Sequence, residues 1–314
     1  MNVLFLDSVH PILKERLSSS GYNCIERFSE PLNELDNEFQ EAYGIVIRSR
    51  FRLDSAIFNK CSKLKFIARS GSGLENIDIL EAEKRNVKIY NSPEGNCDAV
   101  AEHVIGMLLM LFNNLCRSDR QVRNGKWVRE GNRGIELNNK TVGIIGYGHT
   151  GSSLARKLIG FGCRIMAHDK YKSGFGNEII EESTLNDLLD SCDIISLHLP
   201  LSEETRFMAN ESFFQSFKNP VCVVNSSRGP ILNTSDLVKA MQKDKVWGAC
   251  LDVLEYEETS FEYLSETKMP EPLKWLSSSD KVVLTPHIAG WTKESYYKLS
   301  SVLADKILAD KNFS

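Results

Sequence analysis

The sequence of 314 residues lacks the features that mark several large classes of protein. Its longest apolar run, Val104 to Phe112, is too short to span a bilayer, and the first residues, MNVLFLD, do not have the layout of a signal peptide. The net charge of −4 gives no reason to expect nucleic acid or a membrane surface as a partner. We therefore expect a soluble globular protein of the cytoplasm.

The eight cysteines are scattered and form no C-x-x-C pair and no Cys/His cluster at metal-binding spacing. Several of them, such as Cys222 and Cys250, lie inside apolar runs. We expect them to be small core residues in a reducing compartment, with no metal site and no disulfide bonds.

Short apolar runs alternate with helical patterns along most of the chain, which predicts mostly parallel sheets with helices on both faces, an α/β fold. The length suggests two domains. Three stretches interrupt the alternation. Residues 98–115 read as one long apolar helix, residues 117–139 as a polar connector in which Trp127 is a packing anchor, and residues 255–280 as an irregular insertion.

Residues 140–169 contain the strongest motif of the chain. An apolar run ends at Gly146, a G-x-G-x-x-G turn follows through Gly148 and Gly151, and a helical stretch leads to a second run that ends at Asp169. Such a turn brings backbone N–H groups and a helix N-terminus to a pyrophosphate. A carboxylate at the end of the second strand accepts hydrogen bonds from a ribose and repels a 2′-phosphate, so we expect NAD rather than NADP.

Two sites before this motif are candidates for binding an anion. Arg48 and Arg50 follow a predicted strand, two residues apart, so on an extended chain they would point the same way. They would suit a phosphate or a carboxylate, and the alternative is a pair of solvated surface arginines. The turn that includes Ser72 and Gly73 precedes a helix and offers backbone N–H groups, although it is equally compatible with an ordinary strand-to-helix turn.

Three residues that follow later strands could carry acid–base chemistry. His287 could be the acid–base group, because histidine is the side chain that exchanges protons near neutral pH, Glu257 could orient its imidazole, and Arg228 could hold a carboxylate and polarise the adjacent oxygen. Each residue alone has a structural alternative, and Glu255 and Glu258 compete with Glu257. Their shared place after strands of one presumed sheet favours a joint role, because strand ends gather at one edge.

The chain resembles the NAD-dependent D-2-hydroxyacid dehydrogenases over essentially its whole length. The matching stretches are RSGSGLENID, VAEH, GKW, VGIIGYGHTG, LHLPL, NSSRGP, LDVLEYEE and TPHIAGW. The resemblance implies two doubly wound parallel-sheet domains. A Rossmann NAD domain, residues 97–288, would be inserted into a flavodoxin-like substrate domain made of residues 1–96 and 289–314, with catalysis in the cleft.

The resemblance also assigns residues. It implies Arg228, Glu257 and His287 as the catalytic set and Asp252 as a contact of the nicotinamide carboxamide. It implies that the backbone at Ser72-Gly73 holds the substrate carboxylate. The cofactor-binding residues that we expect are Gly146, Gly148, His149, Thr150, Gly151, Asp169, His198, Pro200, Thr205, Ser226, Asp252 and Gly290.

The motif Arg48-Ser49-Arg50 resembles a phosphate-contacting R-S-R of the family members that act on 3-phosphoglycerate. The expected reaction is therefore the oxidation of 3-phosphoglycerate to 3-phosphohydroxypyruvate, which leads to serine. Glyoxylate, hydroxypyruvate, D-lactate or 4-phosphoerythronate are alternative substrates, and an NAD-sensing corepressor is an alternative of another class. The resemblance further implies a homodimer and, because the sequence ends after its last helix, no C-terminal regulatory domain.

Overall fold

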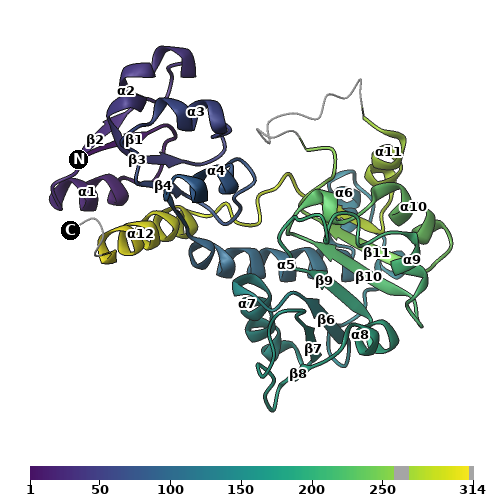
Figure 1. Cartoon of the computed structure of the whole chain (residues 1–314). Helices are drawn as coiled ribbons and strands as arrows, with labels where there is room; N and C mark the ends of the chain where they lie inside the picture. Colours follow the sequence, from purple (N-terminus) through teal and green to yellow (C-terminus); the bar gives the residue numbers. More distant parts are fainter. Residues whose placement is uncertain (258–268, 311–314) are drawn as a thin grey trace. The chain divides into compact units, whose positions relative to one another are not determined.

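The computed structural model describes residues 1–257 and 269–310, and the chain divides into two compact units. Unit 1 contains Met1–Asn96 and the segment that begins at Trp291, and unit 2 contains Cys97–Gly290 (Figure 1). The predicted α/β fold is confirmed, since each unit is built on its own parallel sheet. The crossings between the units fall at residues 96/97 and 290/291, close to the expected domain boundaries at 96/97 and 288/289.

Unit 1 has a five-stranded sheet in the order β2-β1-β3-β4-β5. This order is that of a flavodoxin-like fold, as the sequence predicted. Its strands and helices are β1 (Asn2–Phe5), α1 (Pro11–Ser19), β2 (Asn23–Glu26), α2 (Asp36–Glu41), β3 (Ala42–Ile47), α3 (Ser55–Lys60), β4 (Phe66–Arg69), α4 (Ile79–Lys84), β5 (Lys88–Asn91) and α12 (Lys293–Ala309).

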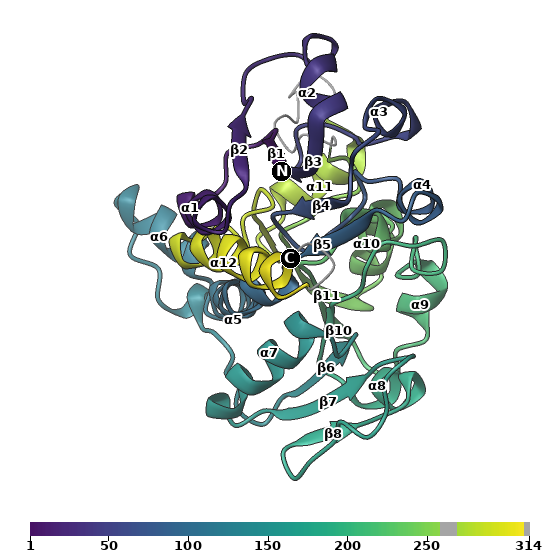
Figure 2. The same ribbon diagram turned by 60° about the vertical axis from the view of Figure 1, so that its left-hand side comes forward.

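Helix α12 joins the end of the chain to the sheet at its beginning. It lies beside α1 (Figure 2), and its buried residues Leu303, Ala304 and Ile307 share a core cluster with Val3 and Phe5 of β1. Lys306 donates hydrogen bonds to the carbonyl of Asn91 and the carboxylate of Glu94 at 2.8 and 2.9 Å. Unit 1 is therefore one domain made from both ends of the sequence.

Unit 2 has a seven-stranded parallel sheet in the order β12-β11-β10-β9-β6-β7-β8. The first six strands in sequence have the spatial order of a Rossmann fold. Its elements are α5 (Cys97–Phe112), α6 (Leu115–Arg123), β6 (Thr141–Ile145), α7 (His149–Leu158), β7 (Arg164–His168), β8 (Ile180–Glu182), α8 (Leu185–Ser191), β9 (Ile194–Leu197), α9 (Glu211–Gln215), β10 (Val221–Asn225), α10 (Thr234–Gln242), β11 (Val246–Leu251), α11 (Glu271–Ser278) and β12 (Val282–Leu284).

The strands of unit 2 are apolar on both faces because helices cover both. In β10, Cys222 and Val224 join the core cluster that contains α5 and α7, whereas Val221 and Val223 join the cluster that contains α9 and α10. Alternate residues of a strand point to opposite faces, so a near-continuous apolar run is what a strand buried on both sides requires. The apolar helix α5 is accordingly a core helix of unit 2.

Two expectations about irregular segments were wrong. The predicted connector begins with α6, a helix with no buried residue, and Trp127 is 81% exposed rather than a packing anchor. The predicted irregular insertion contains α11, whose Leu273 and Leu276 are buried. The prolines that suggested a loop stand at its start, where proline is compatible with a helix. Residues 258–268 of the insertion lie outside the described residues.

In the described part of the chain, no helix taken singly has the length and apolar character needed to cross a membrane. Helices α5 and α6 reach that length and apolar character only when they are taken together, and the chain bends by 61° between them.

Candidate functional site

The glycine turn after β6 is built as a dinucleotide site requires. Gly146 has φ +94°, and a Cβ there would lie 2.2 Å from the carbonyl oxygen of His198. A Cβ on Gly151 would lie 2.0 Å from the carbonyl oxygen of Gly146. No atom lies within 4 Å of a Cβ built on Gly148, so this residue leaves open space at the start of α7. Gly146 and Gly151 are therefore required because any side chain there would collide with backbone atoms, whereas Gly148 leaves room for a ligand.

Asp169 is held beside this turn, as the sequence predicted. It follows β7, and its carboxylate accepts hydrogen bonds from the backbone N–H groups of Tyr147 (2.8 Å), Tyr171 (2.9 Å) and Lys172 (3.0 Å). The N–H of Gly146 also binds the carbonyl of His168, the last residue of β7, at 2.8 Å. The acid is therefore fixed next to the place where a ribose would lie beyond the pyrophosphate.

The loops after β9 and β10 present two buried polar atoms without a partner among the described residues, Nδ1 of His198 and Oγ of Ser226. Nε2 of His198 lies 2.8 Å from the hydroxyl of Ser196. Burial lowers the pKa of His198 from 6.5 to about 4, so the imidazole is neutral at pH 7. Buried polar atoms normally have partners, so these two atoms, at the sheet edge that bears the glycine turn, fit the polar groups of a bound dinucleotide.

The remaining expected cofactor residues occupy the same edge of the sheet or the helix that starts there. His149 and Thr150 open α7, and Gly290 lies in the turn after β12. The hydroxyl of Thr205 donates to the carbonyl of Pro200 at 2.6 Å and shapes the loop after β9. Taken together, the residues present fit NAD.

The predicted catalytic residues lie in loops after three neighbouring strands, β10, β11 and β12. Nδ1 of His287 is 2.8 Å from Oε2 of Glu257, while Oε1 of Glu257 accepts the N–H of Leu254 at 2.5 Å. Glu255 instead binds the N–H of Thr234 at 2.8 Å, which caps α10. The geometry thus favours Glu257 over Glu255, and Glu258 lies outside the described residues.

The loop of Arg228 packs directly on the loop of Glu257. A Cβ on Gly229 would lie 1.9 Å from the carbonyl oxygen of Leu254, so only glycine allows this approach. The side chain of Asn225 donates to the carbonyl of Arg228 at 2.9 Å, and the guanidinium of Arg228 donates to the carbonyl of Ser227 at 2.6 Å. Arg228 is therefore held in a fixed loop at the same sheet edge as the His287–Glu257 pair.

Asp252 organises the loop that carries His287. Its Oδ1 accepts the hydroxyl of Thr285 at 2.5 Å and the N–H of Ile288 at 2.9 Å, and its Oδ2 accepts the N–H of Ala289 at 2.9 Å. Burial raises the pKa of Asp252, but the hydrogen bonds from His103, Thr285 and the two amides outweigh it and leave the pKa below its ordinary value. The carboxylate that the resemblance assigned to the nicotinamide carboxamide is thus engaged with the protein on both oxygens.

His103, to which the sequence gave no role, contacts this cluster. Its Nε2 lies 3.0 Å from the hydroxyl of Thr285 and 3.5 Å from Oδ1 of Asp252. In the sequence, His103 is only a polar residue near the start of an apolar helix. Nothing near it in the sequence connects it with Thr285, which comes 182 positions later.

In unit 1 the structure separates the two candidate phosphate-binding arginines. They lie beyond the end of β3, where the chain bends, so the extended geometry that would align them is absent. The guanidinium of Arg50 donates to the carbonyls of Leu6 (3.3 Å), Arg27 (3.1 Å) and Glu30 (2.9 Å). The guanidinium of Arg48 instead stacks on Trp291, 4.5 Å from the ring centroid. The two guanidiniums therefore have different surroundings within unit 1, backbone carbonyls for Arg50 and the Trp291 ring for Arg48.

The other predicted substrate contact, the turn at Ser72-Gly73, is tied to the rest of unit 1. The hydroxyl of Ser72 donates to the side chain of Asn96 at 2.8 Å, and its carbonyl accepts the side-chain N–H of Asn91 at 2.7 Å. The turn is therefore a fixed feature of unit 1.

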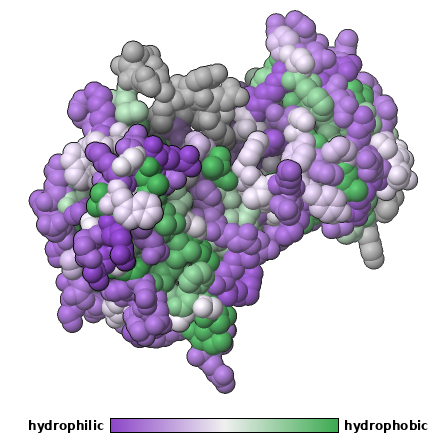
Figure 3. Space-filling view, turned by 180° about the vertical axis from the view of Figure 1, so that it is seen from behind, coloured by the Kyte–Doolittle hydropathy of each residue, from purple (hydrophilic) through white to green (hydrophobic). Residues whose placement is uncertain are grey.

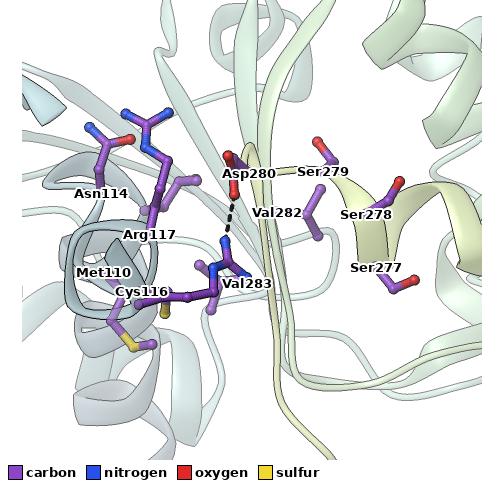
Figure 4. A pocket seen from close by; sticks show the side chains of 12 residues that line it. Met110, Asn114, Cys116, Arg117, Ser277, Ser278, Ser279, Asp280, Val282 and Val283 are labelled. Carbon is purple, nitrogen blue, oxygen red and sulfur yellow. Dashed lines mark hydrogen bonds and ion pairs between the residues drawn. The ribbon is translucent and has the colours of Figure 1, made fainter. Parts of the chain in front are cut away.

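One pocket of about 240 Å³ lies elsewhere in unit 2, between α6 and α11 (Figure 4). Arg120 pairs with Asp280 at 2.9 Å, and Arg117 binds the side chain of Asn132 at 2.9 Å. Because protein groups already engage both cations and no candidate catalytic residue lines it, this pocket adds nothing to the site. No cluster of three metal-ligating side chains occurs within residues 1–257 and 269–310.

Fold and site together define a two-domain dinucleotide-binding protein with a His–Glu pair next to its cofactor site. Residues 105–289 match the family model "D-isomer specific 2-hydroxyacid dehydrogenase, NAD binding domain". The chain is 33% identical over 278 residues to the hydroxypyruvate reductase of Thermotoga maritima, with 88% of each chain covered. It therefore belongs to the D-2-hydroxyacid dehydrogenase family, and unit 2 holds the NAD-binding domain of that family, as the sequence predicted.

Two other relatives show the range of the family. The chain is 32% identical over 313 residues to the D-3-phosphoglycerate dehydrogenase of Archaeoglobus fulgidus, covering 98% of this chain and 57% of the relative. It thus spans about half the length of the D-3-phosphoglycerate dehydrogenases that it matches. A crystal structure of D-lactate dehydrogenase from Aquifex aeolicus with NAD and lactic acid is 27% identical, with a TM-score of 0.82, and 98% and 95% of the two chains covered.

Replacing Asp169 should relax the choice of dinucleotide. Asp169→Asn keeps one of the two oxygens that accept the neighbouring N–H groups and removes the charge that would repel a 2′-phosphate. We expect the ratio of the Kd for NADPH to the Kd for NADH to fall by about tenfold or more, since each factor of ten corresponds to about 1.4 kcal/mol. Fluorescence titration with both nucleotides measures this ratio, with Glu181→Gln on β8 as control. An unchanged ratio in Asp169→Asn would assign the preference to other residues.

The partly buried, neutral imidazole of His198 should make stability depend on pH. Its folded-state pKa of about 4 lies below the ordinary 6.5, so between these values the unfolded chain binds a proton that the folded chain does not. This contribution is complete above pH 6.5 and decreases as the pH falls toward 4, by about 2 kcal/mol between pH 7.5 and 5. Urea unfolding at both pH values should show a smaller pH effect in His198→Gln than in the wild type. His149→Gln, at an exposed position, should keep the wild-type difference.

Proposed function

We propose that this chain is an NAD-dependent oxidoreductase that oxidises a D-2-hydroxy acid to the 2-keto acid. The observation that carries the proposal is the pair of His287 and Glu257, 2.8 Å apart, at the sheet edge that also bears the glycine turn. A histidine is the usual group for exchanging a proton near neutral pH. Family membership supports the same reaction class.

Each residue has a distinct task in this proposal. Glu257 accepts a hydrogen bond from Nδ1–H of His287, which leaves Nε2 to exchange a proton with the substrate hydroxyl. Arg228 holds the substrate carboxylate and polarises the oxygen on C2 through charge-assisted hydrogen bonds. Gly146, Gly148 and Asp169 hold the dinucleotide, which when bound accepts a hydride from C2.

For the substrate we propose 3-phosphoglycerate, which would make the protein a D-3-phosphoglycerate dehydrogenase of serine biosynthesis. Arg48, stacked on Trp291, supports this proposal as the candidate phosphate ligand. Several relatives with about 30% identity carry that name. All eight cysteines are free thiols, which suits the reducing cytoplasm in which we place the reaction.

A small unphosphorylated acid such as hydroxypyruvate is the second candidate. Two observations favour it. The guanidinium of Arg50 donates to three carbonyls, which leaves fewer of its donors for a phosphate, and the hydroxypyruvate reductase relative matches along 88% of both chains. The two candidates share the fold, the cofactor and the His–Glu pair and differ only at the distal end of the substrate.

NADH oxidation with 3-phosphohydroxypyruvate, hydroxypyruvate, glyoxylate and pyruvate separates these candidates. If Arg48 binds the phosphate, Arg48→Ala should raise the KM for 3-phosphohydroxypyruvate about tenfold or more, the loss expected for a charge-assisted contact. The KM for hydroxypyruvate should stay within about twofold. Equal effects on both acids would reject the phosphate role, and NADH binding without turnover of any acid would reject the enzyme.

Arg50→Met serves as the matched variant in this experiment. Because it removes the donor of three backbone carbonyls, it should lower the free energy of unfolding by about 1–3 kcal/mol. We expect this loss of stability together with an unchanged preference between the two acids.

We further propose that the protein forms a homodimer through the segment after α5. Apolar side chains gather on the face of unit 2 seen in Figure 3. Between α5 and β6 the exposed apolar residues are Leu115, Val122, Trp127, Val128 and Ile135, all at least 43% exposed. Such a concentration of exposed apolar side chains marks an interaction surface, and a second copy of the chain is its proposed partner.

Light scattering coupled to gel filtration tests the dimer. The wild type should have twice the mass of one chain, and Trp127→Lys combined with Val122→Lys should shift it to the mass of one chain with an unchanged circular dichroism spectrum. A wild type with the mass of one chain at micromolar concentration would reject the proposed dimer.

A further inference from the structure

The backbone at His287 adopts a conformation that is uncommon for a residue with a side chain. Its φ is +54°, in the left-handed region. Such conformations persist where the surrounding structure holds them. The direction of the imidazole depends on this backbone, because the side chain leaves from the same Cα. The contacts that hold the loop at residues 285–289 therefore also determine where the acid–base group points.

One residue provides most of these contacts. The backbone N–H groups of three consecutive residues donate to Asp252. The N–H of His287 donates to the backbone carbonyl of Asp252 at 2.7 Å, and the N–H groups of Ile288 and Ala289 donate to its carboxylate at 2.9 Å each. The carboxylate is buried. Any rotation of Asp252 would break at least two of these bonds at once.

The orientation of Asp252 is fixed in turn by Thr285 and His103. The hydroxyl of Thr285 has one proton, and its nearest acceptor is Oδ1 of Asp252 at 2.5 Å, whereas the sulfur of Met107 is 3.6 Å away. Toward His103, 3.0 Å away, the same hydroxyl oxygen must therefore accept. Nε2 of His103 carries the proton, and the chain of donors runs from His103 through Thr285 to Asp252.

His103 is well placed to anchor this chain of hydrogen bonds. It belongs to α5, whose neighbouring residues Val104, Met107 and Leu108 are buried in the core of unit 2. A helix fixed by core packing moves less than a loop. The side chain thus links the loop after β12 to a rigid element more than 180 residues earlier in the sequence.

We propose that His103 is a positioning residue for His287. It acts through Thr285 and Asp252 to hold the left-handed backbone at residue 287, and with it the contact between His287 and Glu257. The described contacts of His103 are with Thr285 and Asp252, so it shapes the site without taking part in proton or hydride transfer. The catalytic consequence rests on the proposed function, whereas the structural consequence does not.

Two substitutions separate this role from a general effect on folding. His103→Leu keeps much of the volume and removes the donor. His103→Gln places an amide N–H near the position of Nε2 and should restore the bond to Thr285. Glu102→Gln is the matched control on the same helix, because the exposed carboxylate of Glu102 pairs with Lys157 at 2.9 Å.

Hydrogen–deuterium exchange of the protein without added nucleotide tests the structural part. In His103→Leu, peptides covering residues 285–289 should exchange at least fivefold faster than in the wild type. Peptides from β6 and β10 should be unchanged. His103→Gln and Glu102→Gln should resemble the wild type. Unchanged exchange at 285–289 in His103→Leu, or faster exchange across the whole of unit 2, would overturn the proposal.

Kinetics and binding test the catalytic part. For the preferred 2-keto acid, His103→Leu should lower kcat at least tenfold, His103→Gln should recover it to within threefold, and the Kd for NADH should stay within twofold in both. A His103→Leu enzyme with wild-type kcat would overturn the positioning role and leave the proposed function intact. A wild type with no activity on any acid would reject the proposed function, and the exchange experiment would still decide the role of His103.

Discussion

The hydrogen bonds around Asp252 are the constraint on which the candidate active site depends. A buried carboxylate is tolerated only where it is well hydrogen-bonded, and here its partners are Thr285 and the backbone of the loop that carries His287. The carboxylate and the loop stabilise each other. The carboxylate needs these donors to remain charged, and the loop needs the carboxylate to keep His287 at a positive φ. The acid therefore contributes to the direction of the imidazole before any substrate contact is considered.

The parallel sheet brings the other parts of the site to the same edge. Strands β12, β11 and β10 are neighbours, so the loops of His287, Glu257 and Arg228 emerge side by side although their sequence positions are far apart. The next strands, β9 and β6, bring the loop of His198 and the glycine turn to this edge as well. A cofactor site and an acid–base pair can therefore occupy one edge without any long loop reaching across the sheet.

The sequence predicted the parts of this arrangement that depend on local chemistry. The glycine spacing and Asp169 were recognisable because a tight turn, a phosphate and a ribose each restrict the residue type. The role of Glu257 rather than Glu255 needed the structure, because both are acids in one loop and only their partners, His287 and the N-terminus of α10, distinguish them. His103 was missed for a similar reason, since its partner lies 182 residues away. Helix α6 was missed because none of its residues is buried.

Arg50 shows that a short motif does not by itself determine what its side chains bind. A guanidinium after a strand can bind a phosphate or cap backbone carbonyls, since both use the same donors in the same geometry. In this chain the carbonyls of Leu6, Arg27 and Glu30 occupy three of its five donors, and none of these positions is close to Arg50 in sequence. The fold therefore uses one arginine of the motif for its own stability. The two arginines of the motif are therefore not equivalent, since the guanidinium of Arg48 stacks on Trp291 while that of Arg50 binds backbone carbonyls.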